Sequence, residues 1–148
     1  MNPLVLDAIL AIAHHLAVFS LVAVLVAEFA VSAGTLDIAR LRQLGRLDAA
    51  YGALAGLVLV AGGLRVAFGA KGWSFYAGNP IFWAKLGTFA LVGLLSIVPT
   101  VRLIRWRRAG TLPDAAAVRS LRGWMHAQFV LLVLIPVLAV LMTRGIGA

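Results

Sequence analysis

Four long apolar stretches dominate the chain, and short segments rich in arginine, glycine or proline separate them. The stretches cover approximately residues 4–31, 49–68, 81–104 and 124–142. Each is long enough to form a membrane-spanning helix, because the hydrocarbon core of a bilayer needs about 20 apolar residues per helix. We therefore predict an all-α fold, an integral membrane four-helix bundle. It forms a single domain over residues 1–148, with helices at about 4–33, 48–69, 80–106 and 118–144.

Composition supports this assignment and excludes several kinds of site. Hydrophobic residues make up 63% of the 148 residues and the mean hydropathy is +1.03, so four spans leave no room for a soluble domain. The chain has no cysteine, which excludes disulfides, thiolate catalysis and cysteine-based zinc or iron–sulfur sites. A cleaved signal peptide is not expected, because the first apolar run is too long for one. The net charge of +8 lies mainly in the connections, so we expect contact with the lipid bilayer and no nucleic-acid partner.

The distribution of basic residues predicts the orientation of the chain. The first and third connections carry nearly all of them, whereas the second connection has Lys71 and the C-terminal end has Arg144. The basic residues of the first and third connections are Arg40, Arg42, Arg46, Arg102, Arg105, Arg107, Arg108, Arg119 and Arg122. Positive loops stay in the cytoplasm, so both basic connections are predicted to be cytoplasmic and both termini outside, in the periplasm of a Gram-negative host. We expect a multi-pass protein of the bacterial inner (plasma) membrane.

Two further segments bear on helix packing. Residues 35–46 mix apolar residues with arginines, which indicates either a short amphipathic piece on the inner membrane surface or an extension of the first helix. Gly52 and Gly56 form a small-xxx-small face, which lets helix backbones approach closely. We expect this face to pack against another helix of the same bundle, with a dimer interface as the alternative.

Ionisable residues inside the spans are costly and normally face the bundle interior. Asp7, His14 and Glu28 are spaced by seven and fourteen residues, so they fall on one stripe of the first helix. His15 lies about 100° beside that stripe. Either histidine can therefore point inward, and His14 is slightly favoured.

Depth along the helices sorts these polar residues into two layers. The outer layer holds His14 or His15 together with Arg65 and Lys85. The inner layer is predicted to be a structural polar network, in which Glu28 or Asp48 forms a salt bridge with Arg102. Its members are Glu28, Asp48, Arg102, His126 and Gln128.

The outer layer has residues suited to a haem. Three histidines without cysteine do not make a structural zinc site, and the chain has no catalytic triad spacing and no phosphate-binding loop. An imidazole in an apolar bundle is, however, a natural axial ligand of haem iron. His14 or His15 would then bind the iron, Arg65 would neutralise a propionate, and Lys85 would be a second ligand or proton donor. The alternative is that these side chains only form hydrogen bonds between helices.

Several short motifs resemble a known family over nearly the whole chain. They are Ala-His-His-Leu-Ala at 13–17, Asp-Ala-Ala-Tyr-Gly at 48–52, Asn-Pro-Ile-Phe-Trp-Ala-Lys-Leu at 79–86, Ser-Ile-Val-Pro-Thr at 96–100 and Ile-Pro at 135–136. Together they resemble a family of four-helix bacterial inner-membrane proteins named domain of unknown function 2214. More distantly, the first-helix histidine and the Trp-Ala-Lys-Leu motif look like HemJ-type protoporphyrinogen oxidases, and the histidine pattern looks like CopD membrane domains. In HemJ-type proteins a first-helix histidine and a third-helix lysine are the functional pair and haem b is bound, which maps onto His15 (or His14) and Lys85. The chain departs from that pattern at residues 18–21 and 26–28.

These observations predict a haem-b-binding integral membrane protein of redox type, similar to HemJ-type enzymes, with Lys85 as the catalytic residue. Two alternatives belong to other classes. One is a non-catalytic helical subunit of a larger membrane complex, or a homo-oligomer. The other is a small proton-coupled transporter in which Glu28, Asp48 and His126 relay protons.

Overall fold

The computed structural model describes residues 2–146, and within this range it contains helices and no strands. The elements are α1 (Pro3–Val31), α2 (Ile38–Phe68), α3 (Gly72–Ala77), α4 (Pro80–Ala109) and α5 (Ala115–Thr143). Four of them, α1, α2, α4 and α5, are long and apolar enough to cross a membrane. The predicted all-α fold with four spans is confirmed. The short α3 lies in the turn-rich connection between the second and third spans.

Each long helix begins directly after an asparagine or aspartate that caps it. The caps are Asn2, Asp37, Asn79 and Asp114, whose side-chain oxygens accept hydrogen bonds from backbone N–H groups at 3.0, 2.7, 2.9 and 2.7 Å. Such side chains satisfy N–H groups that have no partner inside the helix. Pro3 and Pro80 occupy the first helical positions, where proline costs no hydrogen bond. The chain therefore specifies the start of each span locally.

Helix α2 differs from the prediction at its start. It begins at Ile38 rather than near residue 48, so most of segment 35–46 is neither a separate surface piece nor an extension of the first helix. Asp37 caps the helix at this point, and Leu41, Leu44 and Asp48 continue one buried stripe toward Tyr51. A capped and continuously buried stripe is enough to extend the helix through the arginines.

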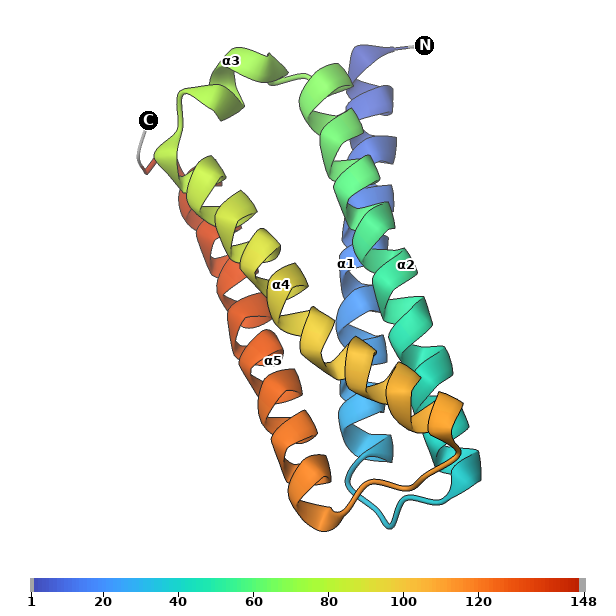
Figure 1. Ribbon diagram of the computed structural model, residues 1–148. Coiled ribbons are helices and arrows are strands. Elements are labelled where there is room, and N and C mark those ends of the chain that lie inside the picture. Colours follow the sequence, from blue (N-terminus) through green and yellow to red (C-terminus); the bar gives the residue numbers. More distant parts are fainter. Residues whose placement is uncertain (1, 147–148) are drawn as a thin grey trace.

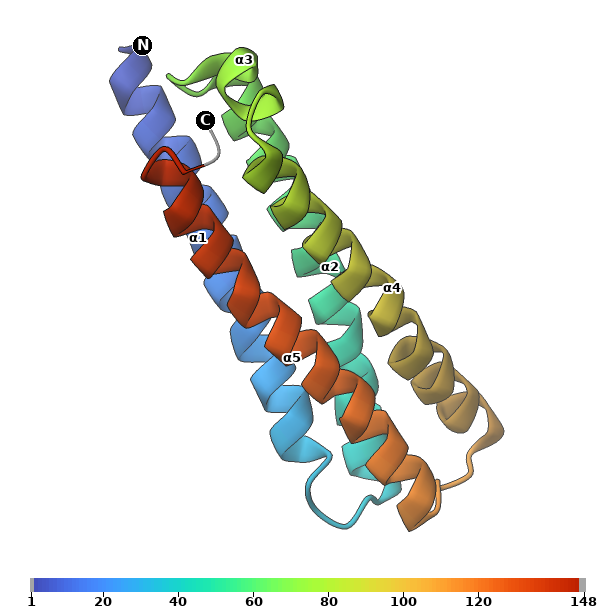
Figure 2. The ribbon, with the colours of Figure 1, turned by 90° about the vertical axis from the view of Figure 1, so that its left-hand side faces the viewer.

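The long helices form two pairs. Helix α1 packs along α2 and α4 packs along α5, while α2 meets α4 and α1 meets α5 through smaller contacts (Figures 1 and 2). Figure 1 shows α3 and both ends of the described chain at one end of the bundle, which we call the terminal end. The α1–α2 and α4–α5 connections lie at the opposite end, which we call the basic end because it carries most of the arginines.

Large apolar side chains cover the outside of the spans. Leu16, Phe19, Val60 and Leu94 are 60–67% exposed, which is the arrangement expected where lipid surrounds a bundle. The Gly52–Gly56 face is also open, because a Cβ added at either glycine would meet no atom of the described chain within 4 Å. The expected packing of this face against another helix of the bundle is therefore wrong for the chain as described.

Candidate functional site

Polar side chains inside the bundle form two clusters at different heights. The first cluster lies in the half of the bundle toward the terminal end and combines His14 of α1, Arg65 of α2 and Lys85 of α4. Lys85 and Arg65 are both close enough to His14 to affect its charge, and Arg65 is close enough to affect Lys85. We call these three residues the imidazole cluster. Three different helices supply it, so its geometry depends on packing of the whole bundle.

The structure distinguishes the two neighbouring histidines. His14 faces α2 at Gly62, where an added Cβ would lie 3.2 Å from His14 Cε1 and 3.4 Å from His14 Nδ1. His14 Nδ1 is buried and makes no hydrogen bond of good geometry among residues 2–146, although the backbone of Val58 on α2 is close enough to act on the ring. His15 is exposed, and its Nδ1 donates a 2.6 Å hydrogen bond to the carbonyl oxygen of Ala11 on its own helix. His14 is therefore the inward-facing imidazole.

The two cations of the imidazole cluster are incompletely paired. Arg65 is half-buried, and its Nε is fully enclosed without a hydrogen-bond partner in the described chain. Lys85 is also half-buried, and its Nζ lies 5.8 Å from the centroid of the Phe82 ring. A buried donor without a partner costs about 1–3 kcal/mol, and more when the group is charged. The cluster therefore combines a guanidinium N–H that lacks a hydrogen-bond acceptor with an imidazole nitrogen that makes no hydrogen bond of good geometry.

Two residues close the cluster at the terminal end. Asp7 Oδ1 accepts a 3.2 Å hydrogen bond from the backbone N–H of Ala70, which ties α1 to the segment after α2. Tyr76 of α3 is buried, and both Asp7 and Arg65 are close enough to influence it. Burial raises the pKa of the Tyr76 phenol above its usual value, while the Arg65 charge opposes this effect. The phenol therefore stays protonated, and Tyr76 is an uncharged side chain at this end of the cluster.

This arrangement suits an anionic ligand that also carries a metal ion, which a neutral imidazole nitrogen can coordinate. Residues 2–146 contain no group of three or more His, Asp or Glu side chains that could hold a metal ion by themselves. A metal bound here needs most of its ligands from a cofactor, as haem iron does. The guanidinium and ammonium groups would bind carboxylates of such a cofactor.

The second cluster lies toward the basic end and differs from the prediction. The expected salt bridge of Glu28 or Asp48 with Arg102 is not formed. Asp48 Oδ1 instead accepts a 2.7 Å hydrogen bond from Thr100 Oγ1, and Arg102 Nη1 donates at 2.8 Å to Ser120 Oγ. Thr100 and Arg102 are two residues apart on α4, so they point about 200° apart around the helix. Thr100 faces α2, and Arg102 reaches α5.

Glu28 and Asp48 form an acidic cluster with Tyr51. Glu28 is 2% exposed and its Oε1 has no hydrogen-bond partner among the described residues. Asp48 is close enough to Glu28 to affect its charge, and both carboxyl groups act on Tyr51. The Tyr51 hydroxyl is buried and also has no partner in the described chain. We call Glu28, Asp48 and Tyr51 the carboxyl cluster.

The remaining members of the predicted inner layer do not join this cluster by hydrogen bonds. His126 is exposed on the outside of α5. Gln128 is buried, but its Nε2 makes only a long 3.4 Å bond to the carbonyl oxygen of Trp124 on its own helix. The prediction grouped His126 and Gln128 with the carboxyl groups by depth alone. The rotation of α5 about its axis directs His126 away from them.

Three further residues contribute to these contacts, although their positions in the sequence did not predict it. Tyr51 completes the carboxyl cluster, and its spacing of three residues from Asp48 on one helix face is the signal that points to it. Thr100 binds Asp48. Arg122 was taken only as an orientation signal, but its Nη1 donates to the carbonyl oxygen of Phe29 at 2.9 Å and to Ser32 Oγ at 3.3 Å. No local pattern predicts which arginine reaches across to α1.

Comparison with known proteins identifies the chain at the level of its family. No curated protein and no solved structure matches it. The resemblance to HemJ-type and CopD-type proteins therefore stays a prediction. The model of the family described as "Predicted membrane protein (DUF2214)" matches residues 6–147, which is nearly the whole length of the chain. The chain belongs to this DUF2214 family of membrane proteins.

Proposed function

We propose that this membrane protein binds haem b at the imidazole cluster and has a redox role. The observation that carries the proposal is the inward-facing His14, whose Nδ1 is buried beside Lys85 and Arg65 and makes no hydrogen bond of good geometry in the described chain. Leaving an imidazole nitrogen and a guanidinium N–H unsatisfied inside a membrane bundle is costly, so a ligand that uses both groups is favoured.

The residues of the cluster fit the chemistry of this cofactor. A neutral imidazole is a strong axial ligand for haem iron, and His14 is the histidine that faces the interior. Arg65 offers charged N–H donors for a propionate, and Lys85 would be the second ligand or the proton donor, which makes it our candidate catalytic residue. Haem supplies reversible one-electron chemistry at its iron when it is bound. The protein residues orient the group, neutralise its carboxylates and keep water away.

The same proposal includes a location. We infer that the protein lies in the bacterial inner membrane, with its basic end in the cytoplasm and its terminal end outside. The arginines of both connections at the basic end support this orientation. The imidazole cluster would then lie in the outer half of the membrane, close to the periplasm.

The experiment is the visible absorption spectrum of protein purified from haem-replete cells. Wild-type protein should show a Soret band, and His14→Ala should lose it because the axial ligand is removed. His15→Ala is the matched control: it removes the same side chain one position away, where the imidazole is exposed and bonded to its own helix. His126→Ala, on the outside of α5, should also leave the spectrum unchanged.

Two results would reject the proposal in different ways. Wild-type protein without a Soret band would exclude haem and favour the alternative of a non-catalytic helical subunit, acting in a larger membrane complex or a homo-oligomer. A band lost in His15→Ala or His126→Ala but kept in His14→Ala would show that haem binds elsewhere.

A further inference from the structure

The carboxyl cluster brings two acidic side chains together without an ion pair to a basic side chain among residues 2–146. Glu28 of α1 and Asp48 of α2 are 2% and 9% exposed, and Asp48 is close enough to act on the charge of Glu28. Asp48 has one hydrogen bond, from Thr100, whereas Glu28 Oε1 has none in the described chain. Two ionised carboxylates at this depth would repel each other and would lack the solvation that water provides.

The arginines near the cluster do not compensate Glu28. Arg102 of α4 is bonded to Ser120, and Arg122 of α5 is bonded to Phe29 and Ser32. Arg107 of α4 is the basic group that acts on Asp48, but it forms no ion pair with it among residues 2–146. Tyr51 of α2 is a further titratable group of the described chain on which both carboxyl groups act.

Tyr51 gives an independent indication that a small ligand is held here. It is 4% exposed, its hydroxyl has no partner in the described chain, and both carboxyl groups are close enough to act on it. Two unpartnered buried oxygens, Glu28 Oε1 and Tyr51 Oη, therefore belong to one cluster. A proton needs one donor and one acceptor oxygen, which two carboxyl groups provide, whereas a metal cation needs several oxygen ligands.

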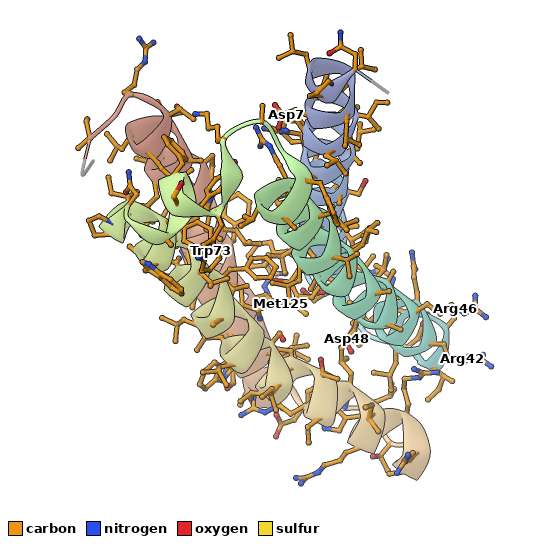
Figure 3. All side chains as sticks on the ribbon, turned by 90° about the horizontal axis from the view of Figure 1, so that it is seen from above. Asp7, Arg42, Arg46, Asp48, Trp73 and Met125 are labelled. Carbon is orange, nitrogen blue, oxygen red and sulfur yellow. The ribbon has the colours of Figure 1, made fainter. Side chains whose placement is uncertain are left out.

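A groove lies at the basic end of the bundle, on the side of this cluster that faces the arginines, and the three cluster residues are not part of its lining. It lies between the start of α2 and the end of α4, has a volume of about 560 Å³, and is lined by Ile38, Leu41, Arg42, Ile104, Arg107 and Arg108, together with Gly110. The Arg107 side chain lies directly against Gly45, one turn before Asp48 on α2. Figure 3 shows Asp48 on the side of α2 that faces α4. Arg107 both lines the groove and acts on Asp48, so the groove approaches the acidic pair from the Asp48 side.

We propose that Glu28 and Asp48 form a proton-binding site that exchanges with the basic end of the bundle through this groove, with Tyr51 as a third hydrogen-bonding group. Uptake transfers a proton from a hydronium ion in the groove to one carboxylate: an O–H bond of the hydronium breaks and leaves water, an O–H bond forms on the carboxyl oxygen, and the other carboxylate accepts the hydrogen bond. Release returns the proton to water by the same route. The site is separate from the imidazole cluster and does not depend on haem binding.

Infrared spectroscopy of the purified protein tests the site directly. Wild-type protein at neutral pH should show the C=O stretching band of a protonated carboxylic acid, shifted when H₂O is replaced by D₂O. The Glu28→Gln, Asp48→Asn double variant should lose the band. Asp114→Asn is the matched control and should keep it, because this exposed carboxylate caps α5 and asparagine caps helices equally well.

Three outcomes would overturn the proposal: no band in wild-type protein, a band that survives in the double variant, or a band abolished when sodium chloride replaces choline chloride. The last result would assign the cluster to a metal cation. If the double variant does not fold, the wild-type band is followed while the pH is raised. A band that is already lost at mildly acidic pH would show that the carboxyl groups are ionised at neutral pH, which contradicts a bound proton.

The route is tested separately with an introduced thiol, which is unique because the chain has no cysteine. Ile104→Cys, in the groove, is modified with a bulky maleimide, and Ile97→Cys, on the same helix outside the groove, is the control. Modification at 104 should slow the hydrogen–deuterium exchange of the carboxyl band, and modification at 97 should not. Equal exchange rates for the two modified proteins would overturn the groove as the route.

Discussion

At the scale of single residues, the important distinction is between His14 and His15. Periodicity correctly grouped His14 with Asp7 and Glu28, but a histidine 100° away can also reach the interior of a small bundle. Gly62 of α2 decides between them, because its missing Cβ leaves room for the His14 ring. The register of α1 against α2 sets this contact, and no local pattern in either helix reveals it.

Gly62 therefore tests the imidazole cluster. Gly62→Ala would bring a methyl group to 3.2 Å from His14 Cε1, so the ring must shift and haem retention should fall. Gly63→Ala is the matched control, since a Cβ there meets nothing within 4 Å. Both changes gain up to about 1 kcal/mol of helix propensity. Gly62→Ala should thus have the lower melting temperature of the two, measured by circular dichroism in detergent. Equal spectra and equal melting temperatures would show that Gly62 does not constrain His14.

Lys85 gives a second prediction at this scale. Lys85→Ala should weaken haem retention or shift the absorption spectrum, because it removes the ammonium group that lies beside His14 and Arg65. Lys71→Ala is the control, since it removes the same charge from an exposed position before α3, where Nζ lies 4.3 Å from the Phe75 ring centroid. Identical spectra for Lys85→Ala and wild-type protein would remove Lys85 from the proposed site.

At the scale of helices, the sequence predicted the spans better than their ends. Mean hydropathy falls in segment 35–46 because of its arginines, so an apolar threshold places the start of α2 too late. The capping side chain of Asp37, with its 2.7 Å bond to the backbone N–H of Arg40, marks the true start. Hydrogen bonds between helices were still less predictable, because they depend on how each helix is rotated about its axis. Arg122 illustrates this: it leaves α5 and binds the last turn of α1.

Arg122 should contribute more to stability than its neighbours on α5. Its guanidinium donates to the carbonyl oxygen of Phe29, lies 4.0 Å from the Phe29 ring centroid, and places a positive charge at the C-terminal end of the α1 dipole. Hydrogen bonds from a charged group contribute about 1.5–3 kcal/mol, so Arg122→Ala should lower the free energy of unfolding by that order. Unfolding in detergent, followed by circular dichroism against added denaturant, measures the change.

Arg119→Ala is the control for this effect. It removes the same charge from an exposed position of α5, and such changes usually alter stability by less than about 0.5 kcal/mol. If the two variants unfold alike, the hydrogen bonds from Arg122 to α1 make no measurable contribution to stability.

At the scale of the whole molecule, the number and the direction of the spans determine which polar residues lie at the same height in the bundle. With four crossings, the first and last residues described lie at the same end, and Figure 1 shows both beside α3. Helix direction and a rise of 1.5 Å per residue predict which polar residues lie at a similar height. They were not enough to predict contacts within a layer. Glu28 and Arg102 share the basic half, yet Arg102 bonds to Ser120 because the rotation of α4 directs it toward α5.

The orientation in the membrane determines which compartment lies nearest to each polar cluster, and it can be tested directly. Nine of the 13 lysine and arginine residues lie in or at the edge of the two connections at the basic end, and the positive-inside rule predicts that such connections stay in the cytoplasm. Alkaline phosphatase, which is active only outside the cytoplasm, should therefore be active when fused after Ala148 and inactive when fused after Thr111. A fusion after Gly34 should also be inactive, since the α1–α2 connection lies at the same end. The reverse pattern would put the groove and the carboxyl cluster on the periplasmic side, and the proposed proton exchange would then occur with the periplasm instead of the cytoplasm.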